Sequence, residues 1–366
     1  MTKKLILMAC LLALLTPVSI FAEGLFSGPE SVAFDSIRNR YLVSNYYNGK
    51  IVAVDADGNH SYFKEGFAHC FGNHIYGDIL YVSADNQLVG LSLETADTVF
   101  SIAIPANNNL DGNTHDDDGY IYVVDTGGGI FKVDPVNHSY SIFVGSGLSN
   151  YPQDIVFDRF NNRLVLACYT TRAPILTIDI SDSTVSEPFN YFPGNLDGIS
   201  IDAEGNFYIS SHQGGGIWKI DNTLEGDPEL ISTGHNEPAG LDVNFRDNIL
   251  AVPNFRGHTM DLIPLGSSGV EDSPEPGPPS RVILHGNYPN PFNASTVIEY
   301  QLPVESNLEI NVYDILGRKV DNIFKGTSGK GTYSVTWDAS NYPSGVYYYR
   351  LTADDGFKTG RMLLLR

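Results

Sequence analysis

The chain has 366 residues, with 22 lysines and arginines against 43 aspartates and glutamates, so its formal net charge at pH 7 is −21. The excess of acid lies in residues 23–265, which hold 11 basic and 32 acidic side chains. This excludes partners bound through phosphates, such as nucleic acid or an anionic membrane surface, because phosphate binding requires a basic face. Most of these acids are expected to form the solvated surface of a secreted protein.

The first 22 residues predict a cleavable secretory signal. Two lysines precede an unbroken apolar run from Leu5 to Leu15, and a small-residue site follows near Ala22. The run is about half the ~20 residues that a membrane-spanning helix needs. We therefore expect residues 1–22 to be removed and the mature chain to have no transmembrane segment.

Residues 23–265 contain six copies of one pattern, whose starts fall 40, 41, 42, 44 and 42 residues apart. Each copy has short runs rich in Val, Ile, Tyr and Phe, separated by turns such as residues 202–206. Four short strands in a unit of this length predict one blade of a β-propeller. The fold class is therefore all-β, with a six-bladed propeller.

Each copy opens its first strand at an equivalent position. In chain order this first column reads Glu30, Cys70, Asp111, Gln153, Asp197 and Ala239. In a ring of six blades, carboxylates in alternate blades would face one centre. Their oxygen atoms, with the Gln153 amide, form the ligand set preferred by Ca²⁺ or another hard divalent cation. We therefore predict Glu30, Asp111 and Asp197 as metal ligands.

A second column comes from the end of the next strand, which lies at the same face of a blade. It reads Asn45, Ala84, Thr126, Tyr169, His212 and Asn254. These polar side chains are expected to surround the carboxylates, so we predict ligand-binding positions at Asn45, Gln153, Tyr169, His212 and Asn254. A cation there could polarise an ester or lactone carbonyl and acidify a water molecule, with Asp197 or His212 as the catalytic proton acceptor.

Three further points follow from single residues. His74 and His115 lie four residues inside their strand starts and are expected to line the channel. Asp111 and Asp197 both precede glycine, so a purely structural role, capping backbone N–H groups of a turn, remains open. Cys70 and Cys168 fall in non-adjacent blades and are expected to be separate thiols rather than a disulfide.

The C-terminal part of the chain has a different composition. Residues 266–280, GSSGVEDSPEPGPPS, predict a semi-extended linker. Residues 281–366 carry nine basic and eight acidic side chains and alternate short strand-like runs with Gly and Pro turns. A second unit of this kind predicts a small immunoglobulin-like β-sandwich.

Four ordered motifs in this second unit carry a resemblance. They are GNYPNPFNASTVIEYQLP, VYDILGRKV, GTYSVTWDASNYPSGVYYYRL and KTGRMLLLR. Residues 286–366 resemble the type A sorting domain of the type IX secretion system, with Ala294 where family members usually have proline. The resemblance implies the secretion machinery as a partner, and a secreted or outer-membrane cell-surface location.

The propeller resembles the calcium-dependent group that holds the gluconolactonase and senescence-marker family, with NHL-repeat proteins as relatives. The segment NLDGISIDAEGNFYIS is similar to a family motif whose Asp binds the metal and is thought to act as base, which maps to Asp197. The segment PESVAF is similar to a start whose Glu is a ligand, which maps to Glu30. The family's other two ligand positions hold Gln153 and Leu110 instead of asparagine.

Two functions are therefore expected as alternatives. The first is an extracellular propeller that binds a small molecule or glycan at a polar, cation-holding face. The second is a calcium-dependent lactonase or esterase, with Glu30 and Asp197 as ligands. The missing family ligands favour the first, and the intact motif around Asp197 favours the second.

Overall fold

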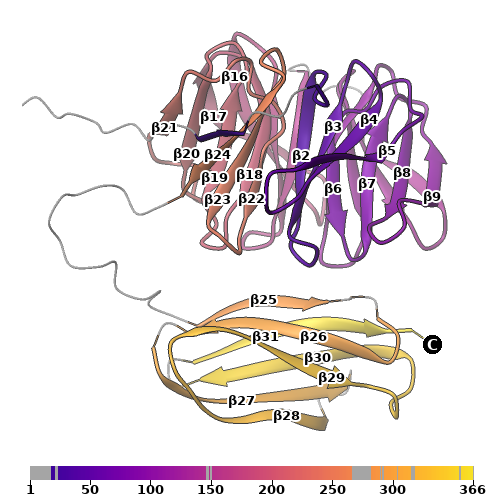
Figure 1. The fold of residues 1–366 in the computed structure, drawn as a ribbon, viewed down its shortest axis with the longest axis vertical. Coiled ribbons are helices and arrows are strands. Elements are labelled where there is room, and N and C mark those ends of the chain that lie inside the picture. The colour runs from indigo at the N-terminus through magenta and orange to yellow at the C-terminus, as the bar shows by residue number, and fades with distance from the viewer. Residues whose placement is uncertain are drawn as a thin grey trace, which may run out of the picture. The chain divides into compact units, whose positions relative to one another are not determined.

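The computed structural model describes residues 18–20, 24–145, 148, 151–265, 282–288, 290, 292–302, 304–314, 318–353 and 356–365. The chain forms two compact units, residues 1–269 and 270–366, each described here by itself (Figure 1). The described secondary structure consists of β-strands, which confirms the all-β class. Within these residues no helix is long and apolar enough to span a membrane. The predicted linker 266–280 lies outside them.

The first unit consists of six antiparallel sheets of four strands, one for each predicted repeat. Blades one to three contain β2 (Pro29–Asp35), β3 (Arg40–Asn45), β4 (Lys50–Val54) and β5 (His60–Lys64); β6 (Asn73–Tyr76), β7 (Ile79–Ala84), β8 (Gln87–Ser92) and β9 (Thr98–Ala103); and β10 (Leu110–His115), β11 (Ile121–Asp125), β12 (Gly129–Asp134) and β13 (Ser139–Val144). Blades four to six contain β14 (Pro152–Asp158), β15 (Arg163–Cys168), β16 (Arg172–Asp179) and β17 (Val185–Pro193); β18 (Leu196–Ile201), β19 (Phe207–Ser211), β20 (Gly216–Ile220) and β21 (Glu229–Thr233); and β22 (Asp242–Asn244), β23 (Ile249–Asn254) and β24 (Thr259–Pro264), with β1 (Val18–Ile20) as the fourth strand. The six-bladed prediction is confirmed.

The outermost strand of blade six comes from the N-terminal side of blade one. β1, the short indigo strand of Figure 1, runs antiparallel to β24, with Val18 opposite Leu262 and Ile20 opposite Met260. β1 lies inside the predicted signal segment, of which residues 1–17, 21 and 22 fall outside the described residues. The signal peptide stays a prediction, and the structure pairs three of its residues with the propeller.

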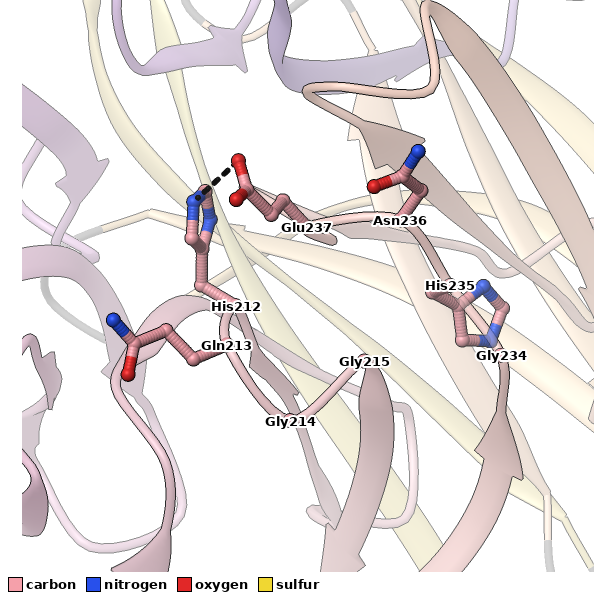
Figure 2. Close-up of a pocket in the computed structure, with 8 residues that line it drawn as sticks. All are labelled: His212, Gln213, Gly214, Gly215, Gly234, His235, Asn236 and Glu237. Carbon is pink, nitrogen blue, oxygen red and sulfur yellow. Dashed lines mark ion pairs between the residues drawn. The ribbon is translucent and has the colours of Figure 1, made fainter.

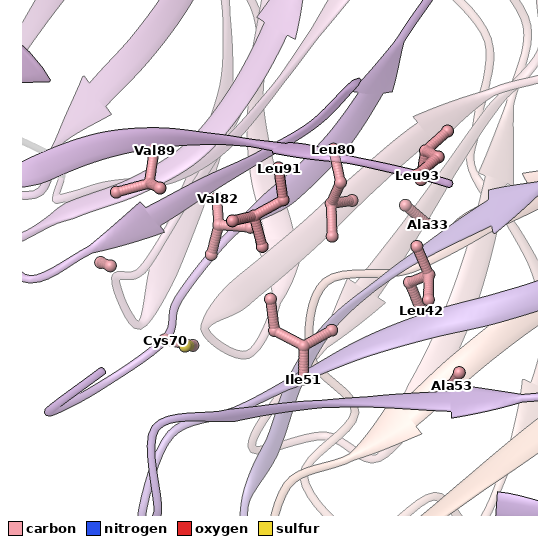
Figure 3. Packing of buried hydrophobic residues seen from close by; sticks show 11 residues of the cluster. Ala33, Leu42, Ile51, Ala53, Cys70, Leu80, Val82, Val89, Leu91 and Leu93 are labelled. Atoms are coloured by element: carbon pink, nitrogen blue, oxygen red, sulfur yellow. The ribbon is translucent and has the colours of Figure 1, made fainter. Parts of the chain in front are cut away.

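Apolar side chains pack between successive blades and close the ring. Between blades one and two, Leu42, Ile51 and Leu80 are fully buried in one cluster (Figure 3). Burial of each such side chain contributes about 1.5–3 kcal/mol relative to exposure. Another cluster joins Val43 of blade one to Met260 of blade six, so the first and last blades are packed against each other.

The turn that follows the inner strand is held by a buried polar side chain. In blade five Asp202 Oδ1 accepts hydrogen bonds from the backbone N–H groups of Glu204 and Asn206, and Gly205 has a positive φ of 91°. This confirms the predicted turn at residues 202–206. The equivalent buried residues of four other blades are Asp35, Asp116, Asp158 and Asn244. These turns lie at the face opposite to the strand starts.

The second unit is a sandwich of two antiparallel sheets. One contains β25 (Ile283–Tyr288), β26 (Ser295–Leu302) and β29 (Gly331–Asp338), and the other contains β28 (Lys319–Ser328), β27 (Ser306–Asp314), β30 (Gly345–Ala353) and β31 (Gly356–Leu364). Burial alternates along β26 and β30, as expected for strands with one face on a core. Trp337 is fully buried in that core. The predicted β-sandwich is confirmed.

Both cysteines of the propeller are free and buried, as predicted. Cys70 lies in the core between blades one and two, and Cys168 in the core between blades three and four. Burial raises the pKa of each thiol to about 12, so both are inert at neutral pH.

Candidate functional site

The inner strands of four blades bulge where they begin, at the face that we call the top face. The pairing register shifts between Pro29 and Ser31, Leu110 and Asn113, Pro152 and Asp154, and Leu196 and Ile199. The bulged positions include Glu30, Asp111, Gln153 and Asp197. Because the extra residue of a bulge leaves the ladder, its side chain is re-aimed. Four members of the predicted first column therefore occupy the same bulged position in their blades.

Blade two departs from the predicted column by one residue. Ser83 of blade two donates a hydrogen bond to the backbone oxygen of Asp111 in blade three, and Ser44 of blade one makes the same contact with Phe71, at 2.6 Å. Cys70 was therefore wrongly placed in the column, because the hairpin that follows is one residue shorter in blade two than in blade three. The ring of equivalent residues, called the inner ring below, consists of Glu30, Phe71, Asp111, Gln153, Asp197 and Ala239.

The three carboxylates of the inner ring interact through their charges. Burial, followed by the charges of Asp197 and Asp111, raises the pKa of Glu30 well above its ordinary value. Burial and the charge of Asp197 likewise raise the pKa of Asp111, which accepts one hydrogen bond, from the backbone N–H of Gly72 at 3.2 Å. The structure thus brings the three predicted carboxylates into one environment. That environment disfavours the ionised forms of Glu30 and Asp111.

The structural alternative for these aspartates is supported in part at Asp111, whose carboxylate accepts a backbone N–H, and is not supported at Asp197 among the described residues. The N–H that Asp111 accepts belongs to the neighbouring blade rather than to its own turn. The carboxylate of Asp197 faces the imidazole of His212. Both side chains are therefore directed at other blades or other strands, and neither caps the turn in which it lies.

Asp154 is a further carboxylate of the site, which neither sequence column marked. Its Oδ2 atom accepts a hydrogen bond of 2.9 Å from the backbone N–H of Ile199, and so links blade four to blade five. Burial raises the pKa of Asp154 to about 7. A Cβ atom on Gly112 would lie 2.2 Å from Asp154 Oδ1, so glycine is required there by close approach. Because Asp154 follows Gln153 directly, only the bulge geometry could identify it.

His212 joins two carboxylates at the edge of the inner ring. Its Nδ1 atom lies 3.1 Å from Asp197 Oδ2. Its Nε2 atom lies 3.3 Å from Glu237 Oε2 (Figure 2). The Nδ1 contact falls outside hydrogen-bond geometry, so we treat it as electrostatic. Burial lowers the pKa of His212, but Asp197 and Glu237 together raise it above its ordinary value. The two acids therefore favour the imidazolium form.

An open cavity of about 620 Å³ adjoins His212 at the top loops of blades five and six. Its lining consists of residues 212–215 and 234–237 (Figure 2). His235, although part of the lining, is buried and faces Asp261 and Ser232, each at 2.8 Å. Glu237 is also held by Arg256, whose Nε atom lies 2.8 Å from Glu237 Oε2. The cavity thus offers His212 and Glu237 to a ligand, while His235 serves the packing of blade six.

The second sequence column is also shifted by one residue in three blades, one, two and six. In blade two, Ala84 follows Ser83 as Asn45 follows Ser44 in blade one. The backbone N–H of His212 donates a hydrogen bond of 2.8 Å to the backbone oxygen of Asn195, which lies two residues before Asp197 of the inner ring. In blades one and six the residues that make this contact are Tyr46 and Phe255. The predicted Asn45 and Asn254 precede them by one position, so their placement at the ring was wrong.

Asn45 and Asn254 instead support the loops that enter the inner strands. Asn45 Oδ1 accepts a hydrogen bond from the backbone N–H of Ser27 at 3.0 Å, and Asn254 Oδ1 accepts one from Asn236 at 3.2 Å. Both asparagines are buried. Their polar atoms are used within the protein, so they hold the top loops rather than face a ligand.

The register correction reveals aromatic side chains that the sequence columns missed. We call them the aromatic arc; it consists of Tyr46, Tyr47, His69, Phe71, Tyr169, His212 and Phe255. The ring centroids of Tyr46 lie 5.3 Å from Phe71 and 5.8 Å from Phe255. His212 continues the arc, at 6.0 Å from Phe255 and 5.5 Å from Tyr169. The arc runs from blade four through blades five, six and one to blade two. Of its members, only Tyr169 and His212 were predicted as ligand-binding residues.

Deeper in the ring, the two predicted channel histidines meet. His74 Nε2 lies 2.6 Å from His115 Nδ1, and the ring of Tyr76 stacks on His115 at 4.1 Å. Burial lowers the pKa of His74 to about 4. Burial and then the charge of His74 lower the pKa of His115. Both imidazoles are therefore neutral at pH 7, and an N–H group of one donates a hydrogen bond to the ring nitrogen of the other.

The donor chemistry of the inner ring suits a hard cation, but its geometry does not converge on one. In the part of the chain that the structure describes, no group of three or more His, Cys, Asp or Glu side chains is arranged to hold a metal ion. Glu30, Asp111 and Asp197 therefore interact by charge without meeting at one point. The predicted Ca²⁺ site stays a prediction, and it would require these side chains to move together.

Residues 287–364 match the family described as the secretion system C-terminal sorting domain. The second unit is therefore the sorting domain of a type IX secretion substrate, as its motifs predicted. A chain with this domain is delivered to the cell surface or secreted, and its partner in delivery is the secretion machinery. A search of curated protein sequences found no match to the chain.

Solved structures confirm the propeller fold. A protein named as a suspected gluconolactonase is 14% identical with a TM-score of 0.58, over 71% of this chain and 95% of its own. A luciferin-regenerating enzyme is 14% identical with a TM-score of 0.57, over 70% and 98%. An auxiliary nutrient binding protein from Bacteroides thetaiotaomicron is 13% identical with a TM-score of 0.55, over 67% and 70%. At such low identity these similarities establish the fold alone, and they include both enzymes and a binding protein.

Proposed function

We propose that the exported propeller binds a small organic molecule at the top face, over the inner ring. One observation carries the proposal: aromatic rings from five blades follow one another around the top face, and His212 among them lies 3.1 Å from the inner-ring carboxylate of Asp197. Aromatic side chains supply a large contact area, and a few polar groups set the orientation of a ligand. The binding of a small molecule or glycan by such a face would suit a protein delivered outside the cell.

The top face offers a ligand two kinds of contact, aromatic rings and oxygen atoms. Tyr46 and Phe255 are partly exposed and offer ring faces. Glu30 and Gln153, also partly exposed, offer oxygen atoms that accept hydrogen bonds. This combination suits ligands with an apolar surface and hydrogen-bond donors, a class that includes sugars and amines.

Binding can be tested by the thermal unfolding of the full chain in the presence of a panel of sugars, amines and lactones. A ligand stabilises the folded state by mass action, by about 2.7 kcal/mol at a concentration of 100 Kd. We expect the shift in Tm to disappear in the double variant Tyr46→Ala, Phe255→Ala. The control Tyr140→Ala removes an exposed ring on an outer strand and should leave the shift intact. A shift that survives the double variant would place the ligand elsewhere.

A second function, hydrolysis of a lactone or ester, is favoured by the contacts of His212. An imidazole between Asp197 and Glu237 could accept a proton from water that attacks a carbonyl. The raised pKa places some of His212 in the protonated form, so the base would be more available at higher pH. Lactone hydrolysis by the full chain should then fall by about 10²-fold or more in His212→Gln. Equal rates in the wild type and this variant would refute the mechanism.

Whether a metal cation contributes to either function can be tested separately. Activity or binding measured with EDTA and with added Ca²⁺ would reveal a requirement for metal. If the predicted Ca²⁺ site exists, Ca²⁺ should raise the Tm of the wild type and not that of Asp197→Asn. A Tm that does not respond to Ca²⁺ would remove the metal from the proposal and leave the binding function standing.

A further inference from the structure

We infer that the ligand of the top face is an organic ammonium ion, held between the aromatic arc and the carboxylates of Glu30 and Asp111. This inference rests on the proposed binding function and specifies the class of its ligand. It follows from two independent features, the charge left unbalanced at the inner ring and the aromatic faces beside it.

Three basic side chains of the top face have acidic partners. His212 contacts both Asp197 and Glu237, and Arg256 contacts Glu237 a second time. In blade two, His69 Nδ1 lies 2.9 Å from Asp85 Oδ1. These three side chains are therefore paired with acids other than Glu30 and Asp111.

Glu30 and Asp111 have no basic partner among the described residues. The carboxylate of Glu30 has no hydrogen bond there either, and Asp111 accepts only the N–H of Gly72. Asp111 is buried and Glu30 is partly exposed, so ionisation without a counter-charge is costlier at Asp111. A cationic ligand would lower that cost on binding, and an anionic ligand would increase it.

The aromatic arc reaches the inner ring at Phe71. Phe71 is the inner-ring residue of blade two, between Glu30 of blade one and Asp111 of blade three. Its ring packs 5.3 Å from that of Tyr46. The face of an aromatic ring is electronegative, and it attracts an ammonium group that has shed its water. Rings and carboxylates thus favour the same sign of charge.

The size of the cation follows from the geometry of the acids. A bare Ca²⁺ ion contacts six to eight oxygen atoms at about 2.3–2.6 Å. No group of three acidic, His or Cys side chains in the described residues is arranged for such contacts. An alkylammonium ion is larger, binds carboxylates by charge and hydrogen bonds, and covers rings with its methyl or methylene groups. It can therefore use carboxylates that do not converge.

The test compares choline with 3,3-dimethylbutan-1-ol, which has the same shape without the charge. Isothermal titration of the full chain should give choline an affinity at least about tenfold higher than the neutral alcohol, as expected for a desolvated cation–π contact with a charge pair. Added NaCl should weaken the binding of choline and leave the binding of the alcohol unchanged. CaCl₂ is titrated in parallel.

Isosteric variants locate the site. Glu30→Gln and Asp111→Asn each remove a carboxylate that bound choline would hold in its ionised form, and each should weaken the binding of choline about tenfold. Tyr46→Leu should weaken it by a similar factor through loss of the ring. Glu94→Gln removes an exposed charge from the β8–β9 turn, at the opposite face, and should have no effect. Circular dichroism spectra of all four variants would confirm that each remains folded.

The outcomes distinguish this inference from the proposed function. Preference for choline that is lost in Glu30→Gln supports the inference. Equal affinity for choline and the alcohol, or binding of neutral sugars alone, overturns it while the proposed function stands. Tight Ca²⁺ binding with no choline binding overturns it in favour of a metal. If choline, the alcohol and the wider panel all fail to bind, both the inference and the proposed function fall.

Discussion

The protonation of His212 is the most direct measurement of the site. Its Nδ1 atom lies 3.1 Å from Asp197 Oδ2 and its Nε2 atom lies 3.3 Å from Glu237 Oε2. At these distances each acid stabilises the imidazolium by about 1.3 kcal/mol even at the dielectric constant of water. Burial opposes this and lowers the pKa, but the net direction is upward. We expect Asp197→Asn to lower the pKa of His212.

Glu237→Gln should lower the same pKa by less, because Arg256 already offsets the charge of Glu237. The assay is NMR titration of the imidazole signals of the full chain, with the His212 signal identified by its loss in His212→Gln. His74 serves as an internal contrast, because burial lowers its pKa to about 4. A wild-type His212 pKa below about 6.5, the ordinary value, would refute the reasoning. So would a value unchanged in both variants.

The same contact makes a prediction about stability. Because the pKa of His212 is raised in the folded state, its stabilisation is fully present below the unfolded pKa of about 6.5 and is lost as pH rises through the folded pKa. Asp197→Asn should therefore lower the free energy of unfolding more at pH 5.5 than at pH 9. Urea unfolding at the two pH values measures the difference. An equal loss at both would show that the ion pair does not govern the effect.

Three other predictions concern different parts of the chain. Asp154, with its pKa raised to about 7, should make the wild type less stable as pH rises from about 4 to about 7. Asp154→Asn should flatten this dependence, by at most about 4 kcal/mol because the side chain is partly exposed; an unchanged profile in urea unfolding would contradict it. Leu42→Ala should lower the free energy of unfolding by about 2–5 kcal/mol, whereas Ile37→Ala, at a position 52% exposed, should change it by less than about 0.5 kcal/mol; similar losses would contradict the packing argument. Deletion of residues 281–366 should leave the protein inside the cell envelope while the propeller, which has its own core, still folds; fractionation and circular dichroism check this, and normal export of the truncated chain would contradict it.

The repeat fixed much of the architecture in advance. Strand runs of Val, Ile, Tyr and Phe with a 40- to 44-residue spacing predicted six blades, because each blade buries its faces against its neighbours and must therefore recur. The sorting domain was equally visible, since its motifs follow one another without interruption from residue 286. The three acids of the inner ring also came from the sequence, because they occupy the same position in repeats of similar length.

What the sequence could not give is the register at the top face. A hairpin one residue shorter in blade two moved Phe71 into the ring in place of Cys70. Hairpins one residue longer in blades one and six than in blades three and five moved Tyr46 and Phe255 into the places expected for Asn45 and Asn254. In a strand a shift of one residue turns a side chain to the opposite face, so an alignment error of one exchanges a buried residue for a ligand-facing one. The acids were determined by the sequence, whereas the aromatic arc beside them was decided only by tertiary structure, because hydrogen bonds between strands and blades set which residue of each repeat reaches the ring.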